Sequence, residues 1–254
     1  MRNTTIYLCE DSLDGIFSAI YTAWAAGTSH TDVRVKDNGT MSFFEEYIEH
    51  PTDYELSSKV ADSIIRKLSY EIYYYIYCAC MSDNSDKASY IYKFLQKAFR
   101  IGPSVINMLT DPYVSGICEL KRAVSNEACR YREFIRFEEL DNGILAGRIA
   151  PTYNVVAMIA NHFADRMPCE NWLILDTKRN LCVVHAAGKG YALTTDIKEE
   201  DLFDTHSYSA QEEDFQALWK RFFDTIAIKE RINPKLQRNL MPLKCRTYMK
   251  AERG

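Results

Sequence analysis

The residues best suited to acid–base chemistry lie in the second half of the chain. His162 falls three residues after Ile159 on an apolar helical stripe, and a histidine can exchange a proton near neutral pH. Glu127 and Asp176 are the carboxyl groups that would act with His162 as acid or base. A histidine on such a stripe equally suits a structural role, with its ring nitrogens hydrogen-bonded in the core. The pattern therefore makes His162, Glu127 and Asp176 candidate catalytic residues and leaves the structural role open.

Three arginines near these positions are candidates for contact with an anion. Arg166 follows the candidate histidine by one helical turn, and a guanidinium in a cleft needs a partner such as Asp176 or a phosphate. Arg136 lies between two apolar residues, where it suits a surface position or a pair with Glu127. Arg179 and Asp176 bracket a predicted hairpin turn, where local hydrogen bonding alone can explain an aspartate. We predict phosphate contacts for all three arginines, with these structural roles as alternatives.

The last quarter of the chain separates its charges. Residues 196–214, the acidic segment, contain eight acidic residues and one lysine, which gives a net charge of −7. Residues 220–254, the basic segment, contain ten basic residues and three acidic ones, which gives a net charge of +7. Lys and Arg neutralise phosphates, and Asn and Gln can hydrogen-bond to them. The predicted nucleic-acid contacts of the basic segment are Lys229, Arg231, Asn233, Lys235, Gln237 and Arg238. The alternative is a solvated tail that pairs with the acidic segment.

The cysteines and glycines show no spacing that would hold a metal or a cofactor. Eight cysteines are scattered without a C-x-x-C pair, and Cys78 and Cys80 diverge if they lie two apart on a helix. Neither a zinc ribbon nor an iron–sulfur loop can be built from these positions. Gly188 and Gly190 are too few for a dinucleotide-binding or phosphate-binding loop. We therefore predict buried reduced thiols, no metal and no cofactor.

Hydrophobic periodicity in the first half predicts the elements that support these residues. The opening is typical of a strand over residues 5–9, a helix from Leu13, and a second strand over residues 33–35. From residue 57 to about residue 126 the chain is predicted to be helical. Its first stripe repeats every four residues and consists of Val60, Ile64, Leu68, Ile72 and Ile76. Asp111 and Pro112 are typical of a further helix start.

The second half alternates between hairpins and helices. Residues 134–137 and 144–149 flank Asp141-Asn142-Gly143, a strong hairpin signal, and a second hairpin joins residues 172–176 to residues 181–185. A helix that ends near Arg166 lies between the two hairpins. The last predicted helix begins with a capping box at Ser209. It is expected to bury Phe215, Leu218, Trp219, Phe222 and Ile226.

These elements predict the α+β class, rich in helix, with a small and mostly antiparallel sheet. We expect a single domain over residues 1–254, in which residues 57–130 form a helical insert and residues 131–254 carry the motifs. The formal charge of −4, from 31 basic and 35 acidic residues, excludes a bulk polycation. A hydrophobic content of 47% excludes a disordered chain. Neither a secretory signal nor a membrane span is visible, so a cytosolic protein is expected.

Several motifs occur in an order that resembles one bacterial family. They are Arg136-Phe137, Ala150-Pro151, the run from Ala160 to Arg166, Trp172, Asp176, Arg179, and the run from Ile228 to Arg238. The chain resembles a family of domains of unknown function described as probable DNA metabolism proteins. The resemblance covers roughly residues 85–250, and the strand and helix around Asp14-Gly15 are also similar to the family's start.

The resemblance implies a role in DNA repair or modification. It implies DNA as a ligand, single-stranded DNA included, and a radical-SAM protein as a partner; in some members the domain is fused to a uracil-DNA-glycosylase-like domain. No glycosylase motif is visible in this chain. Our leading hypothesis is an accessory protein that binds nucleic acid. The alternatives are an enzyme acting on a nucleotide or base through His162 with Glu127 or Asp176, and a protein-interaction scaffold whose acidic and basic segments dock partner proteins.

Overall fold

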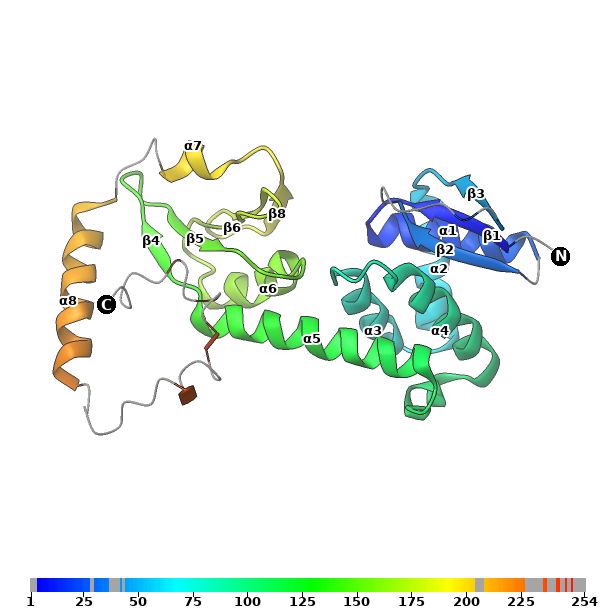
Figure 1. Cartoon of the computed structure of the whole chain (residues 1–254). Coiled ribbons are helices and arrows are strands. Elements are labelled where there is room, and N and C mark those ends of the chain that lie inside the picture. The colour runs from blue at the N-terminus through cyan, green and yellow to red at the C-terminus, as the bar shows by residue number, and fades with distance from the viewer. Residues whose placement is uncertain are drawn as a thin grey trace. The chain divides into compact units, whose positions relative to one another are not determined.

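The structure consists of two compact units. The computed structural model describes residues 4–27, 30–36, 42, 44–203, 208–226, 235–236, 241–242, 245 and 248. The chain divides into unit 1, Met1–Ser125, and unit 2, Asn126–Gly254. Figure 1 labels most elements of both units. Among the described residues, no helix combines the length and the apolar character that a membrane span requires.

Unit 1 is built on a parallel sheet of three strands. β1 (Thr4–Cys9) lies between β2 (Thr31–Val35) and β3 (Glu45–Glu49). Because parallel neighbours need a crossover connection, α1 (Leu13–Ala25) joins β1 to β2 and packs against both strands (Figure 1). The Ser12 side chain caps α1. The predicted strand–helix–strand opening is confirmed.

Helices supply most of the core of unit 1. They are α2 (Tyr54–Lys67), α3 (Tyr70–Cys80), α4 (Lys87–Ile101) and the short 3-10 helix η1 (Pro103–Asn107). The predicted stripe from Val60 to Ile76 is divided between α2 and α3. The division occurs because the Ser69 hydroxyl accepts a hydrogen bond from the Ile72 N–H at 3.1 Å and starts a new helix. The stripe remains buried on both sides of the break.

The longest helix, α5 (Pro112–Phe134), contains the boundary between the units. Its predicted start is confirmed, because the Asp111 carboxylate accepts a hydrogen bond from the Tyr113 N–H at 3.0 Å. The prediction that the helical stretch ends near residue 126 is wrong. Buried Ala128 and Tyr131 continue the apolar stripe of α5 at helical spacing, and this packing extends the helix.

Unit 2 contains a mixed sheet of five strands in the order β4-β5-β6-β7-β8. The strands are β4 (Phe137–Glu139), β5 (Leu145–Ile149), β6 (Trp172–Asp176), β7 (Leu181–His185) and β8 (Tyr191–Thr194). Both predicted hairpin turns are confirmed, and Gly143 in the first turn has a φ of 76°, which favours glycine. The first strand of the first hairpin, predicted over residues 134–137, lies instead at Phe137–Glu139, because α5 continues to Phe134. The α+β class is confirmed. Antiparallel pairing dominates this sheet, with β5 and β6 as its parallel pair, whereas the sheet of unit 1 is entirely parallel.

The helices of unit 2 are α6 (Val156–Arg166), α7 (Glu199–Phe203) and α8 (Ala210–Ile226). The predicted cap of α8 at Ser209 is confirmed, because the Glu212 N–H donates to the Ser209 hydroxyl at 3.0 Å. The other half of the predicted capping box differs: the Glu212 carboxylate accepts from the Glu139 N–H, and the Ser209 N–H donates to the Glu139 carbonyl oxygen at 3.0 Å. The prediction that α8 buries its apolar stripe is wrong. Its side chains are exposed: Phe215 by 60%, Leu218 by 61%, Trp219 by 48% and Phe222 by 51%, while the side chain of Ile226 lies outside the description. The reason is that α8 contacts the sheet through its polar first turn, at β4.

Candidate functional site

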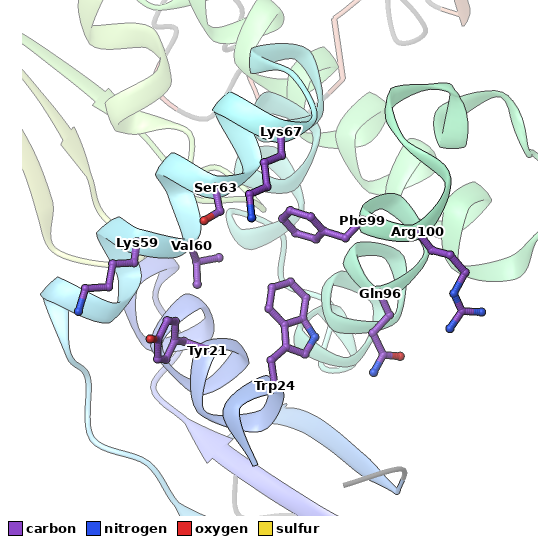
Figure 2. A pocket seen from close by; sticks show the side chains of 9 residues that line it. All are labelled: Tyr21, Trp24, Lys59, Val60, Ser63, Lys67, Gln96, Phe99 and Arg100. Atoms are coloured by element: carbon purple, nitrogen blue, oxygen red, sulfur yellow. The ribbon is translucent and has the colours of Figure 1, made fainter. Parts of the chain in front are cut away.

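A pocket in unit 1 lies between α1, α2 and α4 (Figure 2). It has a volume of about 700 Å³. Its lining consists of Tyr21, Trp24, Lys59, Val60, Ser63, Lys67, Gln96, Phe99 and Arg100. Trp24 of α1 and Phe99 of α4, the aromatic floor, meet edge to face with ring centroids 5.2 Å apart. Both side chains are half-buried, so the core anchors them while they still line the pocket.

Three exposed cations, Lys59 and Lys67 of α2 and Arg100 of α4, form the rim of this pocket. Figure 2 shows Lys67 pointing toward the aromatic floor, with Lys59 and Arg100 on opposite sides of it. The Lys59 ammonium lies 5.9 Å from the centre of the Tyr21 ring, within the range of a cation–π contact. Among the residues that the structure describes, none of those lining the pocket is acidic. The cationic rim therefore attracts anions, and no described carboxylate of the lining opposes them.

The lining suits an anionic ligand that carries a planar group. A ring can stack on the aromatic floor, while the negative charge meets the cationic rim. The Gln96 amide can donate and accept hydrogen bonds, and the Ser63 hydroxyl can do both as well. Sequence reasoning missed this site because three separate helices build it. One signal was present, since Lys59, Ser63 and Lys67 follow each other every four residues on one face of α2.

In unit 2, two of the sequence-predicted residues hold the loop that follows β5. The buried Glu127 carboxylate accepts hydrogen bonds from the N–H groups of Thr152 at 3.2 Å and Tyr153 at 2.7 Å. The Arg179 guanidinium donates to the carbonyl oxygens of Pro151 at 3.3 Å and Thr152 at 2.6 Å. Glu127 and Arg179 therefore bind the same loop backbone from α5 and from the β6–β7 turn.

Asp176 completes this hydrogen-bond network. Its side chain is fully buried and accepts from the Arg179 guanidinium at 3.0 Å. It also accepts from the backbone N–H groups of Lys178 at 3.0 Å and Arg179 at 3.3 Å. The structure thus brings Glu127, Asp176 and Arg179 together around one loop, in contacts that a structural role explains.

The histidine and arginine predicted on α6 differ in exposure. His162 is half-buried, and its Nε2 atom is buried with no hydrogen-bond partner in the described part of the chain. No carboxylate among these residues therefore orients the ring through Nε2. Arg166, one turn later, is exposed to solvent. Its guanidinium is accessible to a phosphate, as the prediction requires.

Arg136 pairs with a residue of the acidic segment. Its guanidinium lies 3.2 Å from the Glu212 carboxylate, so its ionic partner is Glu212 rather than Glu127. A second arginine, Arg148, lies 2.9 Å from Glu138 and 3.5 Å from Glu199, and sequence reasoning did not single it out. Two carboxylates of the acidic segment, Glu199 and Glu212, are therefore engaged by arginines near the sheet.

Most of the predicted contacts in the basic segment cannot be placed. Lys235 is described and is exposed. Lys229, Arg231, Asn233, Gln237 and Arg238 lie outside the described residues. Phosphate contacts at these positions stay predictions. Within the described ranges, no group of three or more His, Cys, Asp or Glu side chains is arranged to hold a metal ion.

The fold and the pocket define an α+β protein with a parallel sheet in one unit, a mixed sheet in the other, and an aromatic and cationic pocket in unit 1. The chain belongs to the family named domain of unknown function DUF4130, whose model matches residues 85–251. This match confirms the resemblance at the level of a domain of unknown function, and the link to DNA metabolism stays a prediction. A search of curated proteins found no match.

Proposed function

We propose that this protein is a nucleic-acid-binding accessory component of DNA repair or modification. The observation that carries the proposal is the pocket of unit 1, with its aromatic floor, its cationic rim and no acidic side chain among the described residues that line it. Nucleic acids offer the two matching features, since phosphates bind lysine and arginine and bases stack on aromatic rings. The family resemblance supports DNA repair or modification as the setting.

The basic segment supplies a second surface for phosphates. It carries a net charge of +7 over 35 residues, and exposed Lys235 lies within it. Internal neutralisation by the acidic segment is the competing explanation. The engagement of Glu199 and Glu212 with Arg148 and Arg136 weakens that explanation, because these two carboxylates already have cationic partners.

A protein partner is the second part of the proposal, and a radical-SAM protein is the partner that the resemblance suggests. Four large apolar side chains form a stripe along one face of α8 and are each about half exposed. A contiguous exposed apolar patch of this kind is typical of a protein interface. We expect Leu218→Ser together with Phe222→Ser to abolish co-purification of the partner and, because neither change alters the charge, to leave nucleic-acid binding unchanged. Unchanged co-purification would contradict a contact on α8.

The salt dependence of binding tests the electrostatic part of the proposal. If about four cations of the basic segment contact single-stranded phosphates, these contacts should contribute about −3 to the slope of the logarithm of affinity against the logarithm of salt. Changing Lys229, Arg231, Lys235 and Arg238 to Glu should remove this contribution and leave the smaller slope that the cationic rim supplies. The control changes four exposed cations outside both surfaces, Lys36, Arg66, Arg122 and Lys178, to Glu. A slope near zero for the unmodified protein would contradict the proposal.

The enzyme alternative receives less support from the described geometry. Both candidate carboxylates, Glu127 and Asp176, accept backbone hydrogen bonds that hold the loop after β5 or the β6–β7 turn. The buried Nε2 of His162 is the observation that favours it, because an unpaired ring nitrogen can accept a proton. Loss of a measured activity in His162→Gln, with unchanged thermal stability, would favour the enzyme.

A further inference from the structure

We infer that the pocket of unit 1 receives one unpaired nucleotide of a single-stranded nucleic acid. The inference rests on the proposed function and specifies which form of nucleic acid the pocket accepts. Its evidence is the placement of the aromatic floor among three cations that come from two helices (Figure 2).

The size and chemistry of the pocket fit a single base. A volume of about 700 Å³ lies in the usual range for small-ligand sites and is far too small for a duplex. Bases inside a duplex are stacked on their neighbours, so they cannot reach an aromatic side chain at the bottom of a pocket. An unpaired base can, and it also leaves its hydrogen-bonding edge free for Gln96 and Ser63.

The spacing of the cations fits a strand better than a free nucleotide. Lys59 and Lys67 are eight residues apart on α2, which corresponds to about 12 Å along the helix axis. Arg100 lies on the opposite side of the aromatic floor from Lys59 (Figure 2). A nucleoside monophosphate carries one phosphate, whereas a strand that crosses the pocket brings a phosphate to each side of the aromatic floor. The cationic rim therefore favours a chain of nucleotides.

Fluorescence anisotropy with a labelled twelve-nucleotide oligo(dT) tests the inference on the full chain. The single strand should bind at least about tenfold more tightly than the same sequence in a duplex. Lys67→Glu and Arg100→Glu should each weaken single-strand binding by about fivefold or more, the effect of one lost phosphate contact at 0.1 M salt. Trp24→Leu should weaken it by about 5- to 100-fold through the lost stacking contact.

Arg66→Glu is the matched control for the rim. Arg66 precedes Lys67 on α2, is exposed, pairs with Asp62 at 3.0 Å and does not line the pocket. The same change of charge at this position should leave binding within about twofold, because Arg66 does not line the pocket. Losing its surface ion pair with Asp62 should also cost the protein little stability. If Trp24→Leu unfolds, as judged by circular dichroism, Phe99→Leu and the two exposed rim variants decide the outcome.

The outcomes separate this inference from the proposed function. Equal affinity for duplex and single strand, or equal effects of Arg66→Glu and Lys67→Glu, would overturn the inference and leave the proposed function in place. Thymidine monophosphate that competes as well as the oligonucleotide would show that a free nucleotide is the ligand, and this too would overturn it. Absence of binding to either nucleic acid at low salt would overturn both.

Discussion

Replacement of Asp176 by Asn or Ala tests the hydrogen-bond network of unit 2. The side chain is fully buried and accepts one guanidinium and two backbone hydrogen bonds. Asparagine keeps an oxygen for the backbone N–H groups but loses the charge that faces Arg179, so we expect the free energy of unfolding to fall by about 1–3 kcal/mol. Alanine leaves the Arg179 guanidinium without its carboxylate, and we expect a loss of about 3–5 kcal/mol.

The assay must report on unit 2. Trp172 is fully buried there, so urea unfolding is followed by its fluorescence in protein whose other two tryptophans, Trp24 and Trp219, are replaced by Phe. Because Arg179→Ala removes the same contact from the other side, the double-mutant cycle should show a coupling of about 1–3 kcal/mol. A loss below about 0.5 kcal/mol for Asp176→Ala, or no coupling, would refute the structural role.

Three further predictions concern packing and thiols. Gly15→Ala should lower stability by about 1–3 kcal/mol, because its Cβ would lie 2.6 Å from a backbone carbonyl oxygen of the preceding loop, and an unchanged melting temperature would contradict this. Burial raises the pKa of Cys9 and of Cys182 to about 12, so at pH 8 both thiols should resist Ellman's reagent in the native protein while exposed Cys129 and Cys169 react. Unfolding returns both thiols to a pKa near 9, so above pH 9 the unfolded state binds fewer protons than the native state. Urea titrations should therefore show the free energy of unfolding falling from pH 9 toward pH 12. A flat profile would contradict this prediction.

Elements whose signals lie within a few residues could be predicted correctly. The first turn of unit 2 needs a positive φ, which Asn142-Gly143 supplies, and the start of α5 needs an acceptor for free N–H groups, which Asp111 supplies. The break between α2 and α3 shows the limit of this reasoning. The apolar repeat continues across it, so periodicity alone does not reveal that the Ser69 hydroxyl starts a new helix.

The candidate site of unit 1 could not be predicted in the same way. Trp24 is an apolar position of one helix in the sequence, and Phe99 is an apolar position of another. They become an aromatic floor because α1 and α4 pack in one core. The same limit applies to Arg136, whose partner Glu212 lies 76 residues away.

Residue types and their order are sufficient to establish the α+β class, the two hairpin turns, the caps at Asp111 and Ser209, and the separation of charge near the carboxyl end, since each depends on neighbours in the chain. Packing decided the rest. An amphipathic pattern predicts that α8 has an apolar face, but it does not predict whether another surface covers that face. A lysine or an aromatic residue lines a pocket only when helices distant in sequence pack together.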